Sequence, residues 1–273
     1  LTINIPNEKG PISLYTLAEA SKDGWIWSIP LGNRYGSGYL YSTENTSDDE
    51  AQRRYYKWLC KNYSYKTEDF RTINYESGYL KEQWIGNCIS VGLASGFVEP
   101  MESTSIHMAI VQAEIITQLY PLRIFKYNVD GYNRKFINYY MEIFDFIRLH
   151  YYTKRRDSKF WKYMSDSTPP WIKEMCEMVK YDFCSEYNLR NTDTYRVFDS
   201  KSYSAILQGL NIYTQREAAE FINRKEVNQS TKESYKQMVK LKDSNRKNVM
   251  DHREYIISLG SDWVAENLLK TNE

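Results

Sequence analysis

The chain has 273 residues, and its 36 Lys and Arg nearly balance its 35 Asp and Glu, which gives a net charge of +1. Without a basic surface, a nucleic-acid partner is not expected. The longest apolar run, Cys88–Val98, is too short and too rich in glycine to cross a bilayer, so we expect no membrane association. Neither a CxxC pair nor a metal-like spacing with the histidines is present. We therefore predict no metal site, a reducing cytoplasmic setting and free, mostly buried thiols at Cys60, Cys88, Cys176 and Cys184.

The N-terminal part of the chain predicts a small sheet. Leu1–Ile5 alternates apolar and polar residues as a strand does, and Tyr15–Ala20 is expected to form a short helix. The glycines of 32–38 favour a hairpin loop over a phosphate cradle because strand-like runs flank them, and Gly38–Ser42 continues as the hairpin partner. The strand before this loop ends at Pro30. Alternate residues of a strand point the same way, so one of its faces is expected to carry Trp25, Trp27 and Ile29.

A helix is expected next, followed by two strands. Ser47 can cap this helix ahead of an acidic first turn, and its apolar face carries Ala51, Tyr55, Trp58 and Leu59. Beyond it, Arg71–Tyr75 and Gly78–Ile85 are predicted as strands, the second running directly into Gly86 and Asn87. A strand followed by a glycine-rich turn and a helix is how ligand sites form at the carboxyl ends of open sheets.

Residues 86–107 carry the most informative pattern. Glycines at 86, 92 and 96 let backbone approach a bulky neighbour because they lack a Cβ. Pro100 then fixes the start of a helix whose apolar residues recur at helical spacing from Ile106 onward, and Ser103 or Thr104 can cap it. The amide groups at such a helix start can hold a small anion. A tight helix–helix contact followed by an ordinary capped helix would explain the same residues without a ligand.

The remainder is predicted to be mainly helical. Tyr132–Tyr152 has apolar residues at spacings of three and four, and Trp171–Val179 follows two prolines that suit a helix start. Residues 225–253 are charged and predict a solvated helix. Lone histidines are more often satisfied core residues than catalytic bases, and we apply that interpretation to His107 and His150.

Three segments resemble the flavin-dependent tryptophan halogenase family. The run GNCISVGLASGFVEPMESTSIH at 86–107 is similar to the family's signature segment, and residues 25–30, WIWSIP, match its W-x-W-x-I-P motif. A third match covers 145–151 and 156–161. The resemblance is good over about residues 12–165 and weak beyond them. It implies an α/β fold, α+β in this chain: a truncated FAD/NAD(P)-binding fold with a mixed sheet and a C-terminal helical substrate module.

The resemblance also implies that the chain contains two modules and that it is part of a longer protein. Residues 1–103 would form the sheet-containing part of the flavin- and substrate-binding domain, and residues 104–273 a mainly helical substrate-side module. The family's dinucleotide fingerprint and catalytic lysine lie well before the W-x-W-x-I-P motif, so both should be absent here. We interpret the chain as the C-terminal half of a family member, and expect it to bind FAD poorly and to be inactive by itself.

The activity that the resemblance implies is FADH2-dependent halogenation of an electron-rich aromatic ring. In the family, reduced FAD from a separate flavin reductase reacts with O₂ to a flavin hydroperoxide, and halide attacks it to give hypohalous acid. A small aromatic substrate is then halogenated, in routes that include antibiotic biosynthesis. Tryptophan, other indoles, pyrroles and phenols stay open, because the region expected to form a substrate lid has no tryptophan and offers Tyr187, Tyr195, Phe198 and Tyr203. A homodimer also stays open.

Site residues follow from the motif matches. Glu102 and Ser103 are the catalytic candidates, and the backbone amides of Thr104 and Ser105 would hold halide, although many family members have glycine at Ser105. We expect the apolar neighbours of Glu102 to raise its pKa, and its family counterpart pairs with the catalytic lysine. The cofactor-binding candidates are Gly86, Asn87, Gly92, Trp25 and Trp27.

Simpler alternatives remain for these residues and for the chain. Glu102 could be an ordinary helix N-terminal acid, Ser103 a cap, and the two tryptophans core aromatics. For the chain, the competing functions are a flavin monooxygenase that hydroxylates its substrate, and a non-catalytic remnant or interaction protein.

Overall fold

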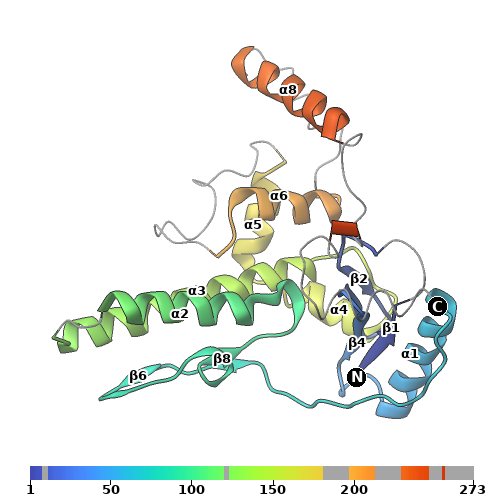
Figure 1. Cartoon of the computed structure of the whole chain (residues 1–273), viewed down its shortest axis with the longest axis horizontal. Coiled ribbons are helices and arrows are strands. Elements are labelled where there is room, and N and C mark those ends of the chain that lie inside the picture. The colour runs from blue at the N-terminus through green and yellow to red at the C-terminus, as the bar shows by residue number, and fades with distance from the viewer. Residues whose placement is uncertain (8–11, 120–122, 181–196, 213–228, 246–253, 256–273) are drawn as a thin grey trace. The chain divides into compact units, whose positions relative to one another are not determined.

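The computed structural model describes residues 1–7, 12–119, 123–180, 197–212, 229–245 and 254–255 (Figure 1). The chain divides into two compact units. The first comprises Leu1–Ile73, Arg155–Tyr163 and Glu220–Glu273, and the second comprises Asn74–Lys154 and Met164–Ala219. The boundary expected between residues 103 and 104 concerns functional modules and stays a prediction.

The first unit contains a four-stranded sheet in the order β1-β4-β3-β2. Its strands are β1 (Thr2–Pro6), β2 (Leu17–Ala20), β3 (Gly24–Pro30) and β4 (Arg34–Tyr41). The strand at the N-terminus and the strand ending at Pro30 were correctly predicted, whereas β4 begins at Arg34, so most of the hairpin loop expected over 32–38 is strand. Every pairing within the sheet is antiparallel, whereas a mixed sheet was expected.

The predicted helix over Tyr15–Ala20 is wrong, because Leu17–Ala20 forms β2. Leu17 pairs with Ser28 and Ala20 with Trp25, so β3 supplies the hydrogen-bonding partner that makes this segment extended. All four residues of β2 are exposed. A short exposed segment has no periodicity of its own, and tertiary pairing decides its conformation.

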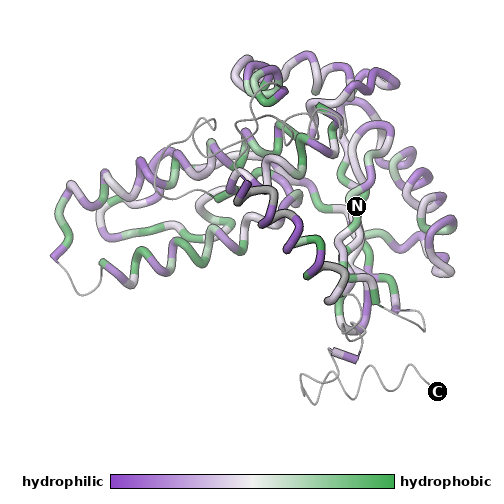
Figure 2. The backbone as a smooth tube through the Cα atoms, turned by 90° about the horizontal axis from the view of Figure 1, so that it is seen from above, coloured by the Kyte–Doolittle hydropathy of each residue, from purple (hydrophilic) through white to green (hydrophobic). Residues whose placement is uncertain are grey.

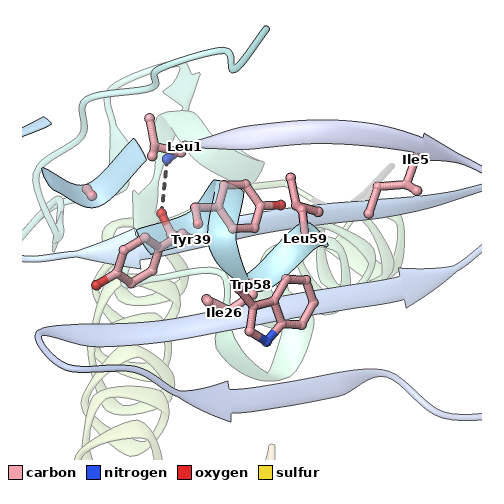
Figure 3. Packing of buried hydrophobic residues seen from close by; sticks show 8 residues of the cluster. Leu1, Ile5, Ile26, Tyr39, Trp58 and Leu59 are labelled. Atoms are coloured by element: carbon pink, nitrogen blue, oxygen red, sulfur yellow. Dashed lines mark hydrogen bonds between the residues drawn. The ribbon is translucent and has the colours of Figure 1, made fainter. Parts of the chain in front are cut away.

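Helix α1 (Asp48–Asn62) packs on this sheet and closes the core of the first unit (Figure 3). Ser47 caps it as predicted, since its side chain accepts a hydrogen bond from the Glu50 amide. The ribbon of α1 alternates between hydrophilic and hydrophobic segments (Figure 2), as an amphipathic helix does. The core comprises the four predicted α1 residues, Ala51, Tyr55, Trp58 and Leu59, together with Leu1, Ile5, Ile26 and Tyr39.

The strands predicted over Arg71–Tyr75 and Gly78–Ile85 are largely wrong. Arg71 makes only an isolated bridge to Thr2, and the second stretch contributes just β5 (Gly78–Tyr79) and β6 (Trp84–Ile85). Residues 71–82 are all exposed, so no buried face stabilises a continuous strand there. The neighbouring strands are equally short: β5 pairs with β8 (Gly96–Phe97), and β6 pairs with β7 (Cys88–Ile89).

Gly86 and Asn87 form the two-residue loop of the β6–β7 hairpin. Gly86 has a φ of 60°, and a Cβ on it would meet no atom within 4 Å. A positive φ at the first loop position is what such a hairpin requires, and glycine meets it without strain. The expected passage from a strand through this turn directly into a helix is therefore wrong, since the hairpin intervenes.

Helices make up most of the remaining second unit. After the 3-10 turns η1 (Gly92–Ala94) and η2 (Met101–Ser103) come α2 (Thr104–Leu119), α3 (Lys126–His150), α5 (Pro170–Met178) and α6 (Ser200–Gly209). Helix α4 (Lys159–Asp166) spans the division between the units, and α8 (Gln229–Asn245) belongs to the first. The predicted helices at 132–152 and 171–179 are confirmed, and α8 lies within the predicted 225–253. Across the described residues, no helix has the length and apolar character needed to span a membrane.

The cysteines are free thiols, as expected, at the three positions that the structure describes. Only Cys176 is buried, which raises the pKa of its thiol to about 12. Cys88 is exposed and Cys60 is half-buried, so the prediction of mostly buried thiols is wrong for these positions. Cys184 lies outside the described residues.

Candidate functional site

The start of α2 has an unusual backbone. Glu102 and Ser103 are consecutive non-glycine residues with φ of 64° and 52°, followed by Thr104 in the right-handed helical region. Left-handed conformations cost non-glycine residues roughly 1–2 kcal/mol each. Such strain persists only where the surrounding structure fixes it, and it is concentrated at functional sites. The succession of left- and right-handed residues also turns neighbouring N–H groups toward one side, a geometry that suits a small anion.

The predicted catalytic and halide-binding residues share this turn. Glu102 and Ser103 are exposed, Ser105 is half-buried and Thr104 is buried. The first amides of an α-helix have no intrahelical acceptor, so those of Thr104 and Ser105 are the groups that an anion could engage. The predicted helix start is confirmed, while a capping bond from Ser103 or Thr104 stays a prediction.

The carboxylate of Glu102 is paired with a histidine. Its Oε1 lies 3.0 Å from Nε2 of His150, the last residue of α3, and the two side chains are 34% and 15% exposed. The other ring nitrogen, Nδ1, lies 2.9 Å from the carbonyl oxygen of Phe146. Because a carbonyl only accepts, Nδ1 must carry a hydrogen. Nε2 and Oε1 therefore share a second proton, either as imidazolium and carboxylate or as neutral imidazole and carboxylic acid.

Glu99, the acidic residue just before this turn, is held by Tyr151, the residue that follows α3. The hydroxyl of Tyr151 donates to Glu99, with distances of 3.2 and 3.0 Å to its two carboxylate oxygens. His150 and Tyr151 thus fix both acids that bracket the start of α2.

A buried polar network holds the preceding loop. The side-chain oxygen of Gln112 accepts the Gly92 amide at 2.7 Å, and its Nε2 donates to Gln83 and Ser95 at 3.1 and 3.0 Å. The Ser95 hydroxyl is also 2.7 Å from that of Tyr140. Since Gln112 occupies the Gly92 amide, a ligand would meet Gly92 only through its Cα surface.

The tryptophans of the W-x-W-x-I-P segment lie in the first unit, on β3. They occupy the face opposite Ile26, which belongs to the core under α1. Trp25 is buried, and its Nε1–H has no acceptor among the described residues. The indole of Trp27 lies over Gly38, where a Cβ would come within 2.6 Å of the ring. The strand face predicted for these residues is confirmed.

The site residues are therefore only partly brought together. Glu102, Ser103, Thr104 and Ser105 form one turn, whereas Gly86 and Asn87 lie on the separate β6–β7 hairpin of the same unit. His107 is exposed, so its interpretation as a core residue is wrong. His150 is satisfied, as expected, but its partner was missed. Its place four residues after Phe146, on the apolar face of α3, was the signal that could have drawn attention to it.

The lid candidates are only partly described. Tyr187 and Tyr195 lie outside the described residues. Phe198 and Tyr203 are buried against the ring of Phe146. No group of three or more His, Cys, Asp or Glu side chains suited to a metal occurs in the part of the chain that the structure describes.

A family model described as tryptophan halogenase matches residues 1–225. The chain belongs to the flavin-dependent tryptophan halogenase family. Tryptophan 6-halogenase ThaL from Streptomyces albogriseolus is 35% identical over 159 residues, which is 57% of this chain and 29% of that protein. The crystal structure of a tryptophan halogenase from Shewanella frigidimarina matches with a TM-score of 0.80 and 26% identity over 93% of this chain.

Tar14, a tryptophan C-6 flavin-dependent halogenase (chlorinase) from taromycin biosynthesis, matches with a TM-score of 0.70 and 29% identity over 83% of this chain. These matches confirm the resemblance and the fold class of this halogenase-family chain. It spans 49% of the Shewanella frigidimarina chain and 46% of Tar14, so it corresponds to less than half of each.

Proposed function

We propose that this halogenase-family chain forms the substrate-side half of an enzyme that halogenates an electron-rich aromatic ring with reduced FAD. The observation that carries the proposal is the strained turn at Glu102 and Ser103, whose carboxylate is paired with His150 inside the family's signature segment. The dinucleotide fingerprint and the catalytic lysine would come from further polypeptide. The chain alone is expected to bind FAD poorly and to be inactive.

Halide would be held at the start of α2. The amides of Thr104 and Ser105, together with the turned N–H groups before them, form a donor set that suits an anion, and the helix dipole favours negative charge there. Reduced FAD, when bound, would supply the two electrons that activate O₂, and the activated oxygen would oxidise halide to hypohalous acid with release of water. The residues proposed to face the flavin are Gly86, Asn87, Gly92, Trp25 and Trp27.

Glu102 would act on the aromatic ring. In the imidazolium–carboxylate form of the pair, Glu102 carries a negative charge that stabilises the cationic ring intermediate and can accept the proton lost from it. His150 would keep this carboxylate oriented while Ser103 places its hydroxyl beside it. The proton taken up by Glu102 would then leave to solvent, to which its side chain is 34% exposed.

The names of the relatives favour tryptophan as the substrate, and other indoles, pyrroles and phenols are the alternatives. A separate flavin reductase would deliver reduced FAD. A cytoplasmic location and a role in antibiotic biosynthesis are parts of the same proposal, and a homodimer is an open extension of it.

The test uses this chain joined to, or mixed with, the remaining half of a family member, a flavin reductase, FAD, and chloride or bromide. The wild type should give halogenated tryptophan, identified by mass. Glu102→Gln should lower turnover by about 10²–10⁴, the usual worth of an acid–base group. Glu174→Gln, on the exposed face of α5, is the control and should leave turnover unchanged. A hydroxylated product would favour a monooxygenase, and undiminished turnover of Glu102→Gln would remove Glu102 from the catalytic group.

A further inference from the structure

One face of α3 carries three residues at intervals of four: Glu142, Phe146 and His150. Residues four apart lie above one another on a helix, so these side chains form a continuous stripe. We call it the α3 stripe. Its three members contact different parts of the second unit, and His150 is the member that reaches Glu102.

Glu142, at one end of the stripe, holds the chain just before α6. Its Oε1 accepts hydrogen bonds from the amides of Val197 and Phe198, both at 3.1 Å. Glu142 is only 6% exposed. A buried carboxylate is costly unless it is hydrogen-bonded, so these contacts fix the backbone at 197–198 as well as the acid.

Phe146, the middle member, is 1% exposed and joins two groups of aromatic rings. It stacks on Phe198 with ring centroids 3.8 Å apart, and the edge of Tyr203 approaches it at 4.8 Å. The imidazole of His150 meets the same ring at 5.1 Å, almost perpendicular to it. The position of the Phe146 ring therefore depends on the 197–203 segment and constrains the imidazole.

His150 completes the connection. Its Nδ1 is anchored on the Phe146 carbonyl, and its Nε2 meets Glu102. Contacts thus run without interruption from Glu142 to the Phe198 amide, from the Phe198 ring to Phe146, and on through His150 to the carboxylate of Glu102. All of these residues belong to one compact unit.

We infer that Glu142 and Phe146 are positioning residues, which hold the 197–203 segment against α3 and thereby set the imidazole of His150 and the orientation of Glu102. The inference rests on the proposed role of Glu102. The 197–203 segment would then influence the reaction through the orientation of Glu102, without itself touching the reacting atoms. A substrate that moves or orders this segment alters the orientation of Glu102 through the α3 stripe.

The experiment compares Glu142→Leu with Glu142→Gln in the full chain. Glutamine keeps a side-chain oxygen that accepts both amides, whereas leucine removes the acceptor at similar size. Glu174→Leu, the same change on the exposed face of α5, is the matched control. Two signals are measured by NMR: hydrogen exchange of the Val197 and Phe198 amides, and the ¹⁵N shifts of the His150 ring, assigned with His150→Gln. Exposed His107 is the internal reference.

Glu142→Leu should speed exchange of the two amides by about tenfold or more and displace the ring shifts of His150, because it removes hydrogen bonds to a buried carboxylate. Glu142→Gln and Glu174→Leu should leave both signals near those of the wild type. Faster exchange with unchanged His150 shifts would refute the connection, and so would equal effects of the leucine and glutamine variants.

Phe198→Leu provides an independent test should Glu142→Leu not fold. It removes the stack on Phe146 and keeps the Glu142 contacts, so the His150 shifts should still change; unaltered shifts would refute the inference. In the completed enzyme, Glu142→Leu should lower kcat more than it raises KM, and Glu142→Gln should restore kcat. If the wild type does not halogenate, the proposed function fails, while the NMR signals still decide whether the α3 stripe positions Glu102.

Discussion

Nε2 of His150 lies 3.0 Å from Oε1 of Glu102, although 48 positions separate the two residues in the chain. The pair joins the last turn of α3 to the strained turn before α2. Glu102 has a positive φ, and its carboxylate is held by the His150 imidazole, whose other nitrogen is hydrogen-bonded to the backbone carbonyl of Phe146.

His150→Phe should lower kcat of the completed halogenase by on the order of 10², because misplacing a catalytic group by about 1 Å has that effect. The phenyl ring keeps the contact with Phe146 but cannot hold Glu102. His150→Gln can still donate to the carboxylate and should retain more activity. Steady-state halogenation kinetics check both, and His107→Gln on the exposed side of α2 is the control. Equal loss in the Phe and Gln variants would mean that the hydrogen bond is not what matters.

The sequence was sufficient wherever the signal was local. Ser47 and the apolar spacing of α1 specified that helix, and the alternation around Trp25 and Trp27 specified β3 and its faces. The start of α2 after Pro100 followed from the helical spacing of its apolar residues. In each case, the information lies within a few turns or one strand of the element that it describes.

Partners distant in the sequence account for the errors. Leu17–Ala20 is extended because β3 pairs with it, whereas the exposed residues 71–82 find strand partners only at Arg71 and in the two-residue β5. The expected passage from the strand before Gly86 into a helix missed the β6–β7 hairpin, which forms because β7 pairs with β6. The contact of His150 with Glu102 depends on how α3 packs, so the sequence around His150 can draw attention to that residue but cannot identify its partner.

The Gln112 network predicts a large loss of stability. Gln112→Leu removes the acceptor of the half-buried Gly92 amide and the donor to the buried side chains of Gln83 and Ser95. Leaving such groups unsatisfied should lower the free energy of unfolding by about 2–3 kcal/mol. Gln118→Leu, on an exposed position of the same helix, should change it by less than about 0.5 kcal/mol. Urea denaturation of the two variants makes the comparison, and similar midpoints would contradict the role of the network.

Asp199 predicts an acid-dependent contribution to stability at α6. Its Oδ1 accepts hydrogen bonds from the backbone amide and the hydroxyl of Ser202, which lower the pKa of the carboxyl group. A folded pKa below the unfolded one means that the stabilisation is full above the unfolded value of about 3.9 and is lost as the pH falls through the folded pKa. Asp199→Asn keeps a capping side chain without the titration.

The wild type should therefore lose stability relative to Asp199→Asn below about pH 4. Asp199→Ala, which removes the cap, should cost about 1 kcal/mol at neutral pH. Melting temperatures of the three proteins at neutral and acid pH test both statements. If the difference in melting temperature between the wild type and Asp199→Asn does not change with pH, the charge of Asp199 is not involved.

Gly96 offers the sharpest test of packing around the signature segment. A Cβ at this position would lie 2.7 Å from the Cβ of Tyr79 and 2.8 Å from the ring of Tyr140, and these two rings stack almost parallel with centroids 5.4 Å apart. Because both rings would have to move, Gly96→Ala should lower the free energy of unfolding by about 1–3 kcal/mol. A Cβ on Gly78 would meet no atom within 4 Å, so Gly78→Ala in the paired strand β5 is the control. Thermal melts that show equal stability of the two variants would mean that the Tyr79–Tyr140 stack does not require glycine at 96.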